Sequence, residues 1–410
     1  MFQNKFIYLT FIISLLYGFD SIAQNNSEVA GYVYDQSNQK PVAQAQIEIQ
    51  ELNINTVTNT EGYFKLKYNK PQGSAFLTVN ALGFKSKKIS LNEITKTQPI
   101  KIFLNSQANM LPAVEMFSIQ ILQELVKKSR AAHNKFTKEN TQFQTAFYRE
   151  TIKKSKRPVS LAESVIRLVR PGEKSFKNDK IAIYKARKIT DYDRLDTLAF
   201  KMQGGPYATL YTDIITYNDK FFDTQALDLL ELRFLGRTQL SGEPVLEVGF
   251  KEKIKDDVWF SGSFFIHEKE QVLVQLHYTL NVEDRKKAAR YFVSKRPRKV
   301  KVYPEQIIYE VHYFRDQNIW RFGYSQVMAE FTVNKKGKLF NTKYFSQSEL
   351  LVTKHQQKNF NLDRKDYIRE DYILIDDKSG FEDATFWGEN NIIEPDKSIL
   401  NAIEKIRAQL

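Results

Sequence analysis

Few residues of this chain combine the types and the spacing that catalysis or metal binding needs. The 410 residues include five histidines and no cysteine. His267 precedes Glu270 by three positions, and such a His-x-x-Glu pair offers zinc an imidazole and a carboxylate. A zinc site needs three or four converging ligands, and the sequence places no third ligand beside this pair. The pair also falls in a predicted turn, Glu268 to Gln271, so we expect no metal site there.

The sequence contains no convincing linear catalytic motif. The chain has no Gly-x-Ser-x-Gly, no phosphate-binding loop, no Gly-x-Gly-x-x-Gly and no His-Glu-x-x-His. Ser37 and Lys40 match Ser-x-x-Lys, but they belong to a predicted polar turn, and the Asp376-Asp377 pair reads as solvated. We therefore predict no catalytic residue, no cofactor and no enzyme activity. The alternative, a hydrolase whose catalytic residues form no linear motif, stays open.

The strongest charge feature is a run of basic residues. The chain has a formal net charge of +13, and the segment from 285 to 301 has nine basic residues and no acidic one. These nine form a candidate anion-binding surface: Arg285, Lys286, Lys287, Arg290, Lys295, Arg296, Arg298, Lys299 and Lys301. The simpler interpretation is a solvated loop and strand edge, where lysine discourages aggregation. If the surface is functional, its ligand is an anionic lipid, lipopolysaccharide or an acidic glycan.

The N-terminus has the features of a secretory signal peptide. Lys5 is followed by an apolar run from Phe6 to Phe19, and small residues at 21 and 23 suit cleavage after Ala23. The run is shorter than the ~20 apolar residues that span a bilayer, and no other segment approaches that length. We therefore expect residues 1–23 to be removed and the mature chain to have no transmembrane segment. The protein is then exported, to the periplasm or to the periphery of the outer membrane, which argues against nucleic acid as its partner.

Residues 27–105 read as the short strands of an antiparallel β-sandwich. Ala45, Ile47 and Ile49 alternate with polar neighbours, so one face of that strand is apolar and the other is wet. The wet face consists of Gln44, Gln46, Glu48 and Gln50. The same alternation recurs over 64–68, 77–81 and 100–104. Several short strands with frequent turn signals predict sheet packed on sheet.

This stretch resembles the carboxypeptidase-regulatory-like domain, a small transthyretin-like β-sandwich. The resemblance rests on the order of strands, turns and glycines. Its segments are Gly31-Tyr32-Val33-Tyr34-Asp35, Pro41-Val42, Thr56 to Leu66 with Gly62, and Leu82-Gly83-Phe84. It implies a non-catalytic accessory module, in agreement with the prediction of a non-enzyme. It also makes the hydrolase alternative specific, because metallocarboxypeptidases carry this accessory domain and use a His-x-x-Glu pair. The Arg and Glu contexts expected of those enzymes are missing here.

A connector and a long antiparallel meander follow. Within 106–140, Leu122, Leu125 and Phe136 fall on one helical stripe, which predicts a helix from Ser118 to about 136 that packs on the next domain. The antiparallel β-rich domain is predicted over 141–360. Nothing between 143 and 353 has the helix and parallel-strand rhythm of an α/β cofactor fold. The candidate strands are 143–152, 160–169, 181–188, 229–236, 245–251, 258–267, 272–280, 306–314, 319–333 and 343–352. The apolar spacing from Ile399 onward predicts a helix in the tail, 361–410, that docks on the sheet.

The meander is similar to the half-barrel of periplasmic lipoprotein carriers and outer-membrane stress sensors. The segments behind this similarity are Phe234 to Gly236, Gly242 to Phe250 and Gly262 to Ile266. The whole arrangement resembles exported proteins of Bacteroidetes. We expect a mainly β fold with a sandwich, a connecting helix, and a large curved antiparallel sheet or half-barrel with a C-terminal helix.

The resulting functional prediction is a non-enzymatic cell-envelope protein. The sandwich acts as an accessory or docking module, and the β-rich domain binds an amphiphilic ligand or an envelope protein. In the amphiphile version, an apolar concave surface holds the acyl chain and the basic run at its mouth holds an anionic head group.

Overall fold

A computed structural model gives the structure of the chain. It describes residues 26–94, 99–106, 117–137, 141–172, 178–191, 201–202, 205–217, 224–253, 259–295, 300–316, 319–337, 339–356, 358–372, 374, 379–383 and 385–407. The predicted signal peptide, 1–23, lies outside these residues, and so do Arg296, Arg298 and Lys299 of the basic run. Among the described residues, no helix combines the length and the apolar character needed to cross a membrane.

The N-terminal region is the predicted sandwich of two sheets. One sheet has the order β4-β1-β7 and consists of β1 (Asn26–Asp35), β4 (Tyr63–Asn69) and β7 (Ile100–Leu104). The other contains β2 (Gln46–Ile49), β3 (Ile54–Val57), β5 (Phe76–Asn80) and β6 (Lys87–Ser90). Apolar side chains of both sheets, such as Ile47, Phe64 and Ile102, are fully buried between them. Gly62 is structural, because it has φ +73° and a Cβ there would lie 2.5 Å from the carbonyl oxygen of Val33.

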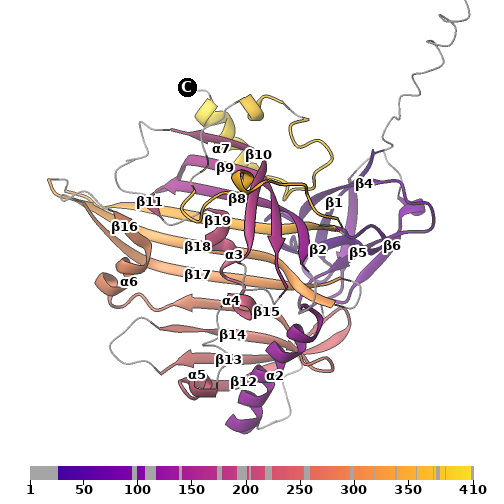
Figure 1. Ribbon diagram of the computed structural model, residues 1–410, viewed down its shortest axis with the longest axis horizontal. Coiled ribbons are helices and arrows are strands. Elements are labelled where there is room, and N and C mark those ends of the chain that lie inside the picture. The colour runs from indigo at the N-terminus through magenta and orange to yellow at the C-terminus, as the bar shows by residue number, and fades with distance from the viewer. Residues whose placement is uncertain are drawn as a thin grey trace, which may run out of the picture.

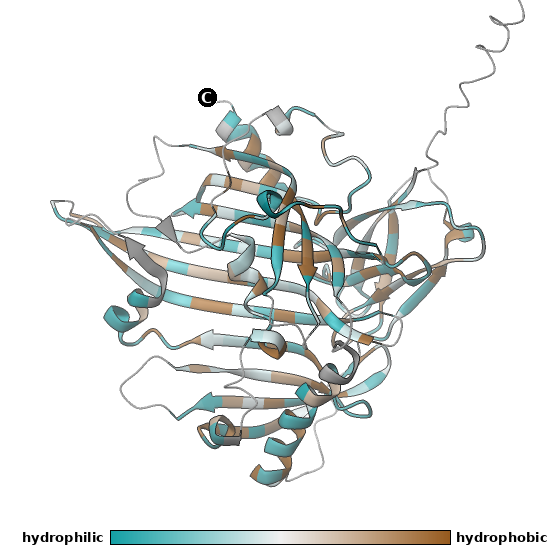
Figure 2. Cartoon of the chain, viewed as in Figure 1, coloured by the Kyte–Doolittle hydropathy of each residue, from teal (hydrophilic) through white to brown (hydrophobic). Residues whose placement is uncertain are grey.

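The second sandwich sheet continues into a much larger sheet of fourteen strands. Its order is β12-β13-β14-β15-β17-β18-β19-β3-β2-β5-β6, with β8, β9 and β10 branching from β19. The remaining strands are β8 (Gln142–Lys154), β9 (Arg157–Arg170), β10 (Lys180–Thr190), β12 (Leu230–Leu240), β13 (Glu243–Glu252), β14 (Phe260–His267), β15 (Leu273–Leu280), β17 (Val300–Asp316), β18 (Ile319–Lys335) and β19 (Thr342–Gln356). The strands lie side by side across the molecule (Figure 1), and apolar and polar bands alternate along them (Figure 2). A twisted sheet of this size curls.

Helices cover the apolar face that the meander was expected to leave open. They are α2 (Ile119–Thr137), α3 (Pro206–Leu210), α4 (Ile214–Tyr217) and α5 (Thr224–Asp228). Leu122 of α2 and Leu210 of α3 belong to one hydrophobic cluster with Leu276 of β15 and Val311 of β17. Where these helices pack, the sheet therefore does not present the bare apolar surface that the amphiphile prediction requires.

The sandwich contacts the large sheet on two sides. On one side Ile54 of β3 pairs with Lys354 of β19. On the other side the backbone N–H of Gly83, in the loop after β5, donates to the carbonyl of Gln239 in β12 over 2.8 Å. The sandwich thus bridges two regions of the curved sheet, and a space lies between them.

The structure confirms the mainly β fold class and most of the predicted elements. The connecting helix α2 packs on β12, β15 and β18, and α7 (Lys397–Arg407) packs on β9 and β10, as predicted. The short helices α3, α4 and α5 were not predicted. The basic run was interpreted as loop and strand, but its first part is a helix, α6 (Arg285–Phe292), and its next part is a short strand, β16 (Val293–Lys295), paired with β11 (Lys201–Met202).

Candidate ligand-binding cleft

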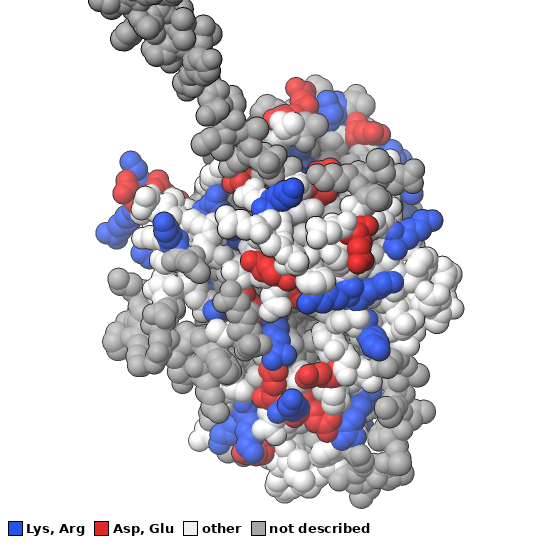
Figure 3. Space-filling model, turned by 90° about the vertical axis from the view of Figure 1, so that its right-hand side faces the viewer, with Lys and Arg blue, Asp and Glu red and all other residues white. Residues whose placement is uncertain are grey.

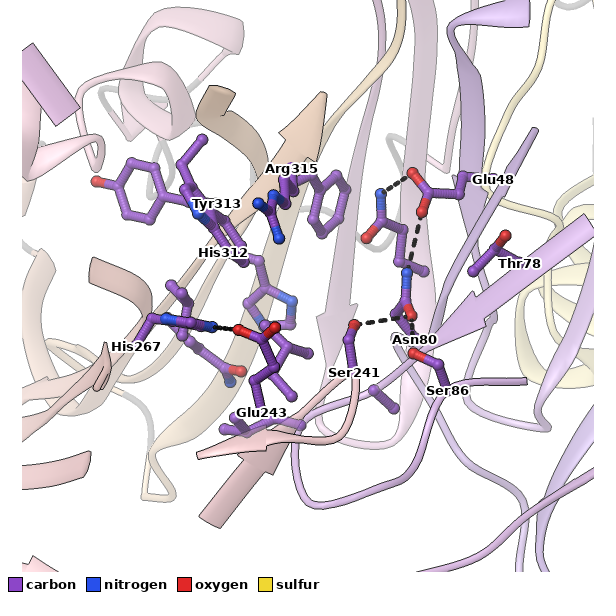
Figure 4. Close-up of a pocket in the computed structure, with 18 of the residues that line it drawn as sticks. Glu48, Thr78, Asn80, Ser86, Ser241, Glu243, His267, His312, Tyr313 and Arg315 are labelled. Carbon is purple, nitrogen blue, oxygen red and sulfur yellow. Dashed lines mark hydrogen bonds and ion pairs between the residues drawn. The ribbon is translucent and has the colours of Figure 1, made fainter. Parts of the chain in front are cut away.

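The polar side chains of β2 and of the residues that flank it line a cleft. Gln44, Gln46, Glu48 and Gln50 line one wall of a cavity of about 340 Å³. The neighbouring strand adds Thr78 and Asn80, and the β12–β13 turn adds Ser241 and Glu243. The opposite wall comes from the ends of β14, β15, β17 and β18. Its residues include His267, Gln275, His312, Phe314, Arg315 and Trp320. Figure 4 shows the two walls facing each other.

The wall from the sandwich is a connected polar network. Glu48 accepts hydrogen bonds from Nδ2 of Asn80 at 3.0 Å and from Nε2 of Gln46 at 3.2 Å. The hydroxyl of Ser241 donates to Oδ1 of Asn80 at 3.0 Å, and the hydroxyl of Ser86 also contacts that atom. Burial raises the pKa of Glu48 to about 7, against the opposing effect of the Asn80 hydrogen bond. The carboxyl is therefore partly protonated at neutral pH.

The opposite wall contains basic side chains that already have acidic partners. Nη2 of Arg315 lies 2.9 Å from Oε1 of Glu270, and Nε1 of Trp320 donates to Oε2 of the same residue at 2.6 Å. Nε2 of His312 lies 2.8 Å from Oε1 of Glu310. The wall therefore offers polar atoms to a ligand. None of the basic residues named here lacks an acidic partner.

His267, Glu270 and Glu243 converge, which corrects one expectation. Their ligand atoms lie within 4.8 Å of one another, so the prediction that no third candidate ligand lies near the His-x-x-Glu pair was wrong. Glu243 precedes His267 by 24 positions, and the pairing of β13 with β14 brings the two together. Nε2 of His267 lies 2.7 Å from Oε2 of Glu243. This close contact is not an aligned hydrogen bond, because Oε2 accepts no hydrogen bond from the described residues.

The hydrogen bonds of this cluster do not suit a metal ion. Nδ1 of His267 accepts the backbone N–H of Glu270 at 3.1 Å, so a neutral ring carries its proton on Nε2, the nitrogen that faces Glu243. Both oxygens of Glu270 are bound by Arg315 and Trp320. A metal ion would have to displace a proton from one ligand and a guanidinium from another.

The basic-run residues that the structure describes do not line this cleft. Arg285, Lys286 and Arg290 are exposed on α6, and Arg285 is paired with Glu305 of β17 at 2.9 Å. Lys301 is exposed at the start of β17, and Lys295 lies in β16. In the side view of Figure 3, positive and negative side chains are mixed over the surface facing the viewer.

Comparison with known proteins identifies the sandwich. Residues 29–116 match the family described as CarboxypepD_reg-like domain, as the sequence predicted. No curated protein matches the chain. The match covers the sandwich and part of the connector, so the rest of the chain is described from its own geometry.

Solved structures share only a distant likeness with the chain. A DUF1329 family protein from Desulfovibrio piger is 9% identical over 60% of this chain and 96% of its own, with a TM-score of 0.24. A putative outer membrane lipoprotein-sorting protein domain from Vibrio parahaemolyticus is 10% identical over 60% and 96%, with a TM-score of 0.25. The MucA/MucB complex of Pseudomonas aeruginosa gives 11% identity over 56% and 93%, with a TM-score of 0.18. Such TM-scores support no statement about function.

Proposed function

We propose that the protein is a non-enzymatic binding protein of the cell envelope and that it holds an uncharged saccharide in the cleft between the sandwich and the curved sheet. The observation that carries this proposal is the row Gln44, Gln46, Glu48 and Gln50. Its members occupy alternate positions of the chain. Gln46 and Glu48 lie on one face of β2, Gln44 and Gln50 lie just outside the strand, and all four line a cavity large enough for a small ligand. The cleft replaces the apolar cavity of the sequence-based prediction as the site of binding.

The lining favours hydroxyl groups. A side-chain amide has two donor hydrogens and a carbonyl acceptor, and a hydroxyl also donates and accepts, so a row of amides complements a polyhydroxylated ligand. The apolar residues Leu82, Leu240, Val274 and Phe314 add contact area for the carbon faces of sugar rings.

The charges of the lining favour a neutral ligand. Arg315, His312 and His267 each lie beside a carboxylate, so a ligand carboxylate or phosphate would compete with an existing partner. Glu48 and Glu243 would also repel an anion at the pH values at which they are ionised. This argument separates the cleft from the anion-binding surface predicted for the basic run.

A glycan array tests the proposal. The full chain is applied to immobilised neutral and acidic glycans, and we expect it to bind members of the neutral set. Gln46→Ala removes an amide from the middle of the row, and its affinity for the bound glycan should fall roughly threefold to tenfold, the value of one net hydrogen bond. Gln120→Ala removes an exposed amide on α2 and should bind like the parent.

Three results would overturn the proposal. They are binding to acidic glycans alone, no binding to any glycan, and equal affinity of Gln46→Ala and the parent. Thermal unfolding of both variants shows whether a loss of binding comes from a loss of folding.

The peptidase-like hydrolase is a second candidate, favoured by the convergence of Glu243, His267 and Glu270. The hydrogen bonds of that cluster weigh against it, since Nδ1 of His267 and both oxygens of Glu270 already have protein partners. Zinc binding separates the two candidates.

A further inference from the structure

The β18–β19 hairpin carries the two most exposed large apolar side chains of the described residues. Leu339 is 96% exposed and Phe340 is 84% exposed. Both lie in the turn between the two strands, where the hairpin projects at the far left of Figure 1. One exposed leucine is ordinary, but an adjacent Leu-Phe pair at a projecting tip presents a continuous apolar contact to whatever the tip meets.

Basic residues lie at the same end of the sheet as this pair. Val300, at the start of β17, pairs with Lys335 of the hairpin. On the other side of the hairpin, the backbone N–H of Ser155 in the β8–β9 turn donates to the carbonyl of Lys343 over 2.7 Å. The neighbouring strand and turn therefore place their cations at the same end of the sheet. Besides Lys343, the exposed cations of this end are five: Lys156, Arg157, Lys301, Lys335 and Lys336.

Two acidic side chains of β17 and β18 pair with cations other than these five. Oε1 of Glu330 lies 2.5 Å from Nζ of Lys343, and Glu305 is paired with Arg285 of α6. Asp284 caps α6, because its carboxylate accepts hydrogen bonds from backbone N–H groups of the first turn of that helix. The helix α6 packs on β17, so the first part of the basic run extends this positive end of the sheet.

We propose that this end of the sheet docks on the surface of an anionic lipid bilayer. Leu339 and Phe340 enter the head-group region, and the surrounding lysines and arginines face the lipid phosphates. A bilayer surface accepts apolar side chains flanked by cations, because the long basic side chains keep their charges in the polar layer while the apolar ones leave water. This surface is separate from the cleft and would hold the protein against a membrane whatever the cleft binds.

Vesicle sedimentation of the full chain tests the proposal. The parent should bind vesicles of phosphatidylglycerol and phosphatidylcholine at low ionic strength and should bind pure phosphatidylcholine weakly. Leu339→Ser/Phe340→Ser should lower partitioning by about tenfold or more, since two apolar side chains no longer leave water. The matched control Ile119→Ser/Ile121→Ser replaces side chains that are 53% and 52% exposed on α2, away from the tip, and should bind like the parent.

A site-specific probe separates membrane entry from protein binding. The chain has no cysteine, so Leu339→Cys gives one labelling site for an environment-sensitive dye. Its emission should shift to the blue with anionic vesicles, while the same dye on Leu400→Cys, at a position 46% exposed on α7, should not respond. The proposal is overturned by a parent that ignores anionic vesicles at low ionic strength, by a Leu339→Ser/Phe340→Ser variant that binds like the parent, or by a dye at 339 that stays in water.

Discussion

Glu48 links the polarity of the cleft to pH. Its carboxyl belongs to the wet face of β2 but is withdrawn from water by the facing sheet, and burial raises its pKa to about 7. The sequence predicts that Glu48 is polar and outward. It does not predict the partial protonation, because the surface that buries Glu48 comes from strands nearly two hundred or more residues away.

We predict that Glu48→Gln stabilises the protein at alkaline pH. The folded pKa lies above the usual 4.5, so the stabilisation from the protonated carboxyl is complete below pH 4.5 and is lost as the pH rises through 7. A neutral amide avoids this loss. The gain in free energy of unfolding should reach ~2 kcal/mol by about pH 8, a value reduced for the partial exposure of the side chain. Urea unfolding that gives the same difference at acid and alkaline pH would contradict this prediction.

We also predict that His267 and its acidic neighbours do not hold zinc in stoichiometric amount. A neutral His267 carries its proton on the nitrogen that faces Glu243, and Glu270 is bound by Arg315 and Trp320. Elemental analysis after equilibration with zinc should give well under one zinc per chain for both the parent and His267→Ala. One zinc per chain, lost together with peptidase activity in His267→Ala, would instead establish the hydrolase.

At the scale of elements, a buried ion network fixes β8, β9 and β10 to the tail. Glu163 of β9 lies 2.6 Å from Nη2 of Arg149 and 2.6 Å from Nη2 of Arg187. Arg149 also donates to the carbonyl of Ile393 in the tail at 2.7 Å. Burial disfavours the charged form of Glu163, but the two guanidinium groups hold its pKa below the usual value.

Glu163→Gln should destabilise the protein by ~3–5 kcal/mol, because it leaves two buried guanidinium groups without their shared counter-charge. Glu382→Gln is the matched control. Its side chain is 71% exposed and lies 3.9 Å from Arg407, so the change should stay within about 0.5 kcal/mol. Chemical denaturation measures both, and equal losses for the two variants would show that the network does not stabilise the fold.

The strands were predictable and several helices were not, for a physical reason. Alternation along a strand is a local pattern, so the meander from 143 to 352 was predicted strand by strand. The helices α3, α4 and α5 have only 5, 4 and 5 residues, and such short helices gain their stability from the sheet they cover. The helix α6 begins after Asp284, whose carboxylate caps its first turn, but the dense basic residues were interpreted as loop.

At the scale of the whole molecule, the sandwich forms part of the proposed site. It bridges β19 and the β12–β13 hairpin, and its wet strand face closes the cleft. The sequence predicts both halves of this arrangement. It does not predict the contact between the sandwich and the sheet, since the hydrogen bond between Gly83 and Gln239 joins residues that no local sequence pattern connects. The helices that pack on the apolar face of the sheet were not predicted for the same kind of reason, because their packing partners lie in distant strands.

The most direct test of the cleft as a ligand site is native mass spectrometry of the full chain purified from a cell envelope. We predict an adduct with the mass of a neutral saccharide, reduced in Gln46→Ala and kept in Gln120→Ala. A phospholipid adduct alone, a zinc adduct, or a saccharide adduct of equal abundance in Gln46→Ala would contradict the assignment of the cleft.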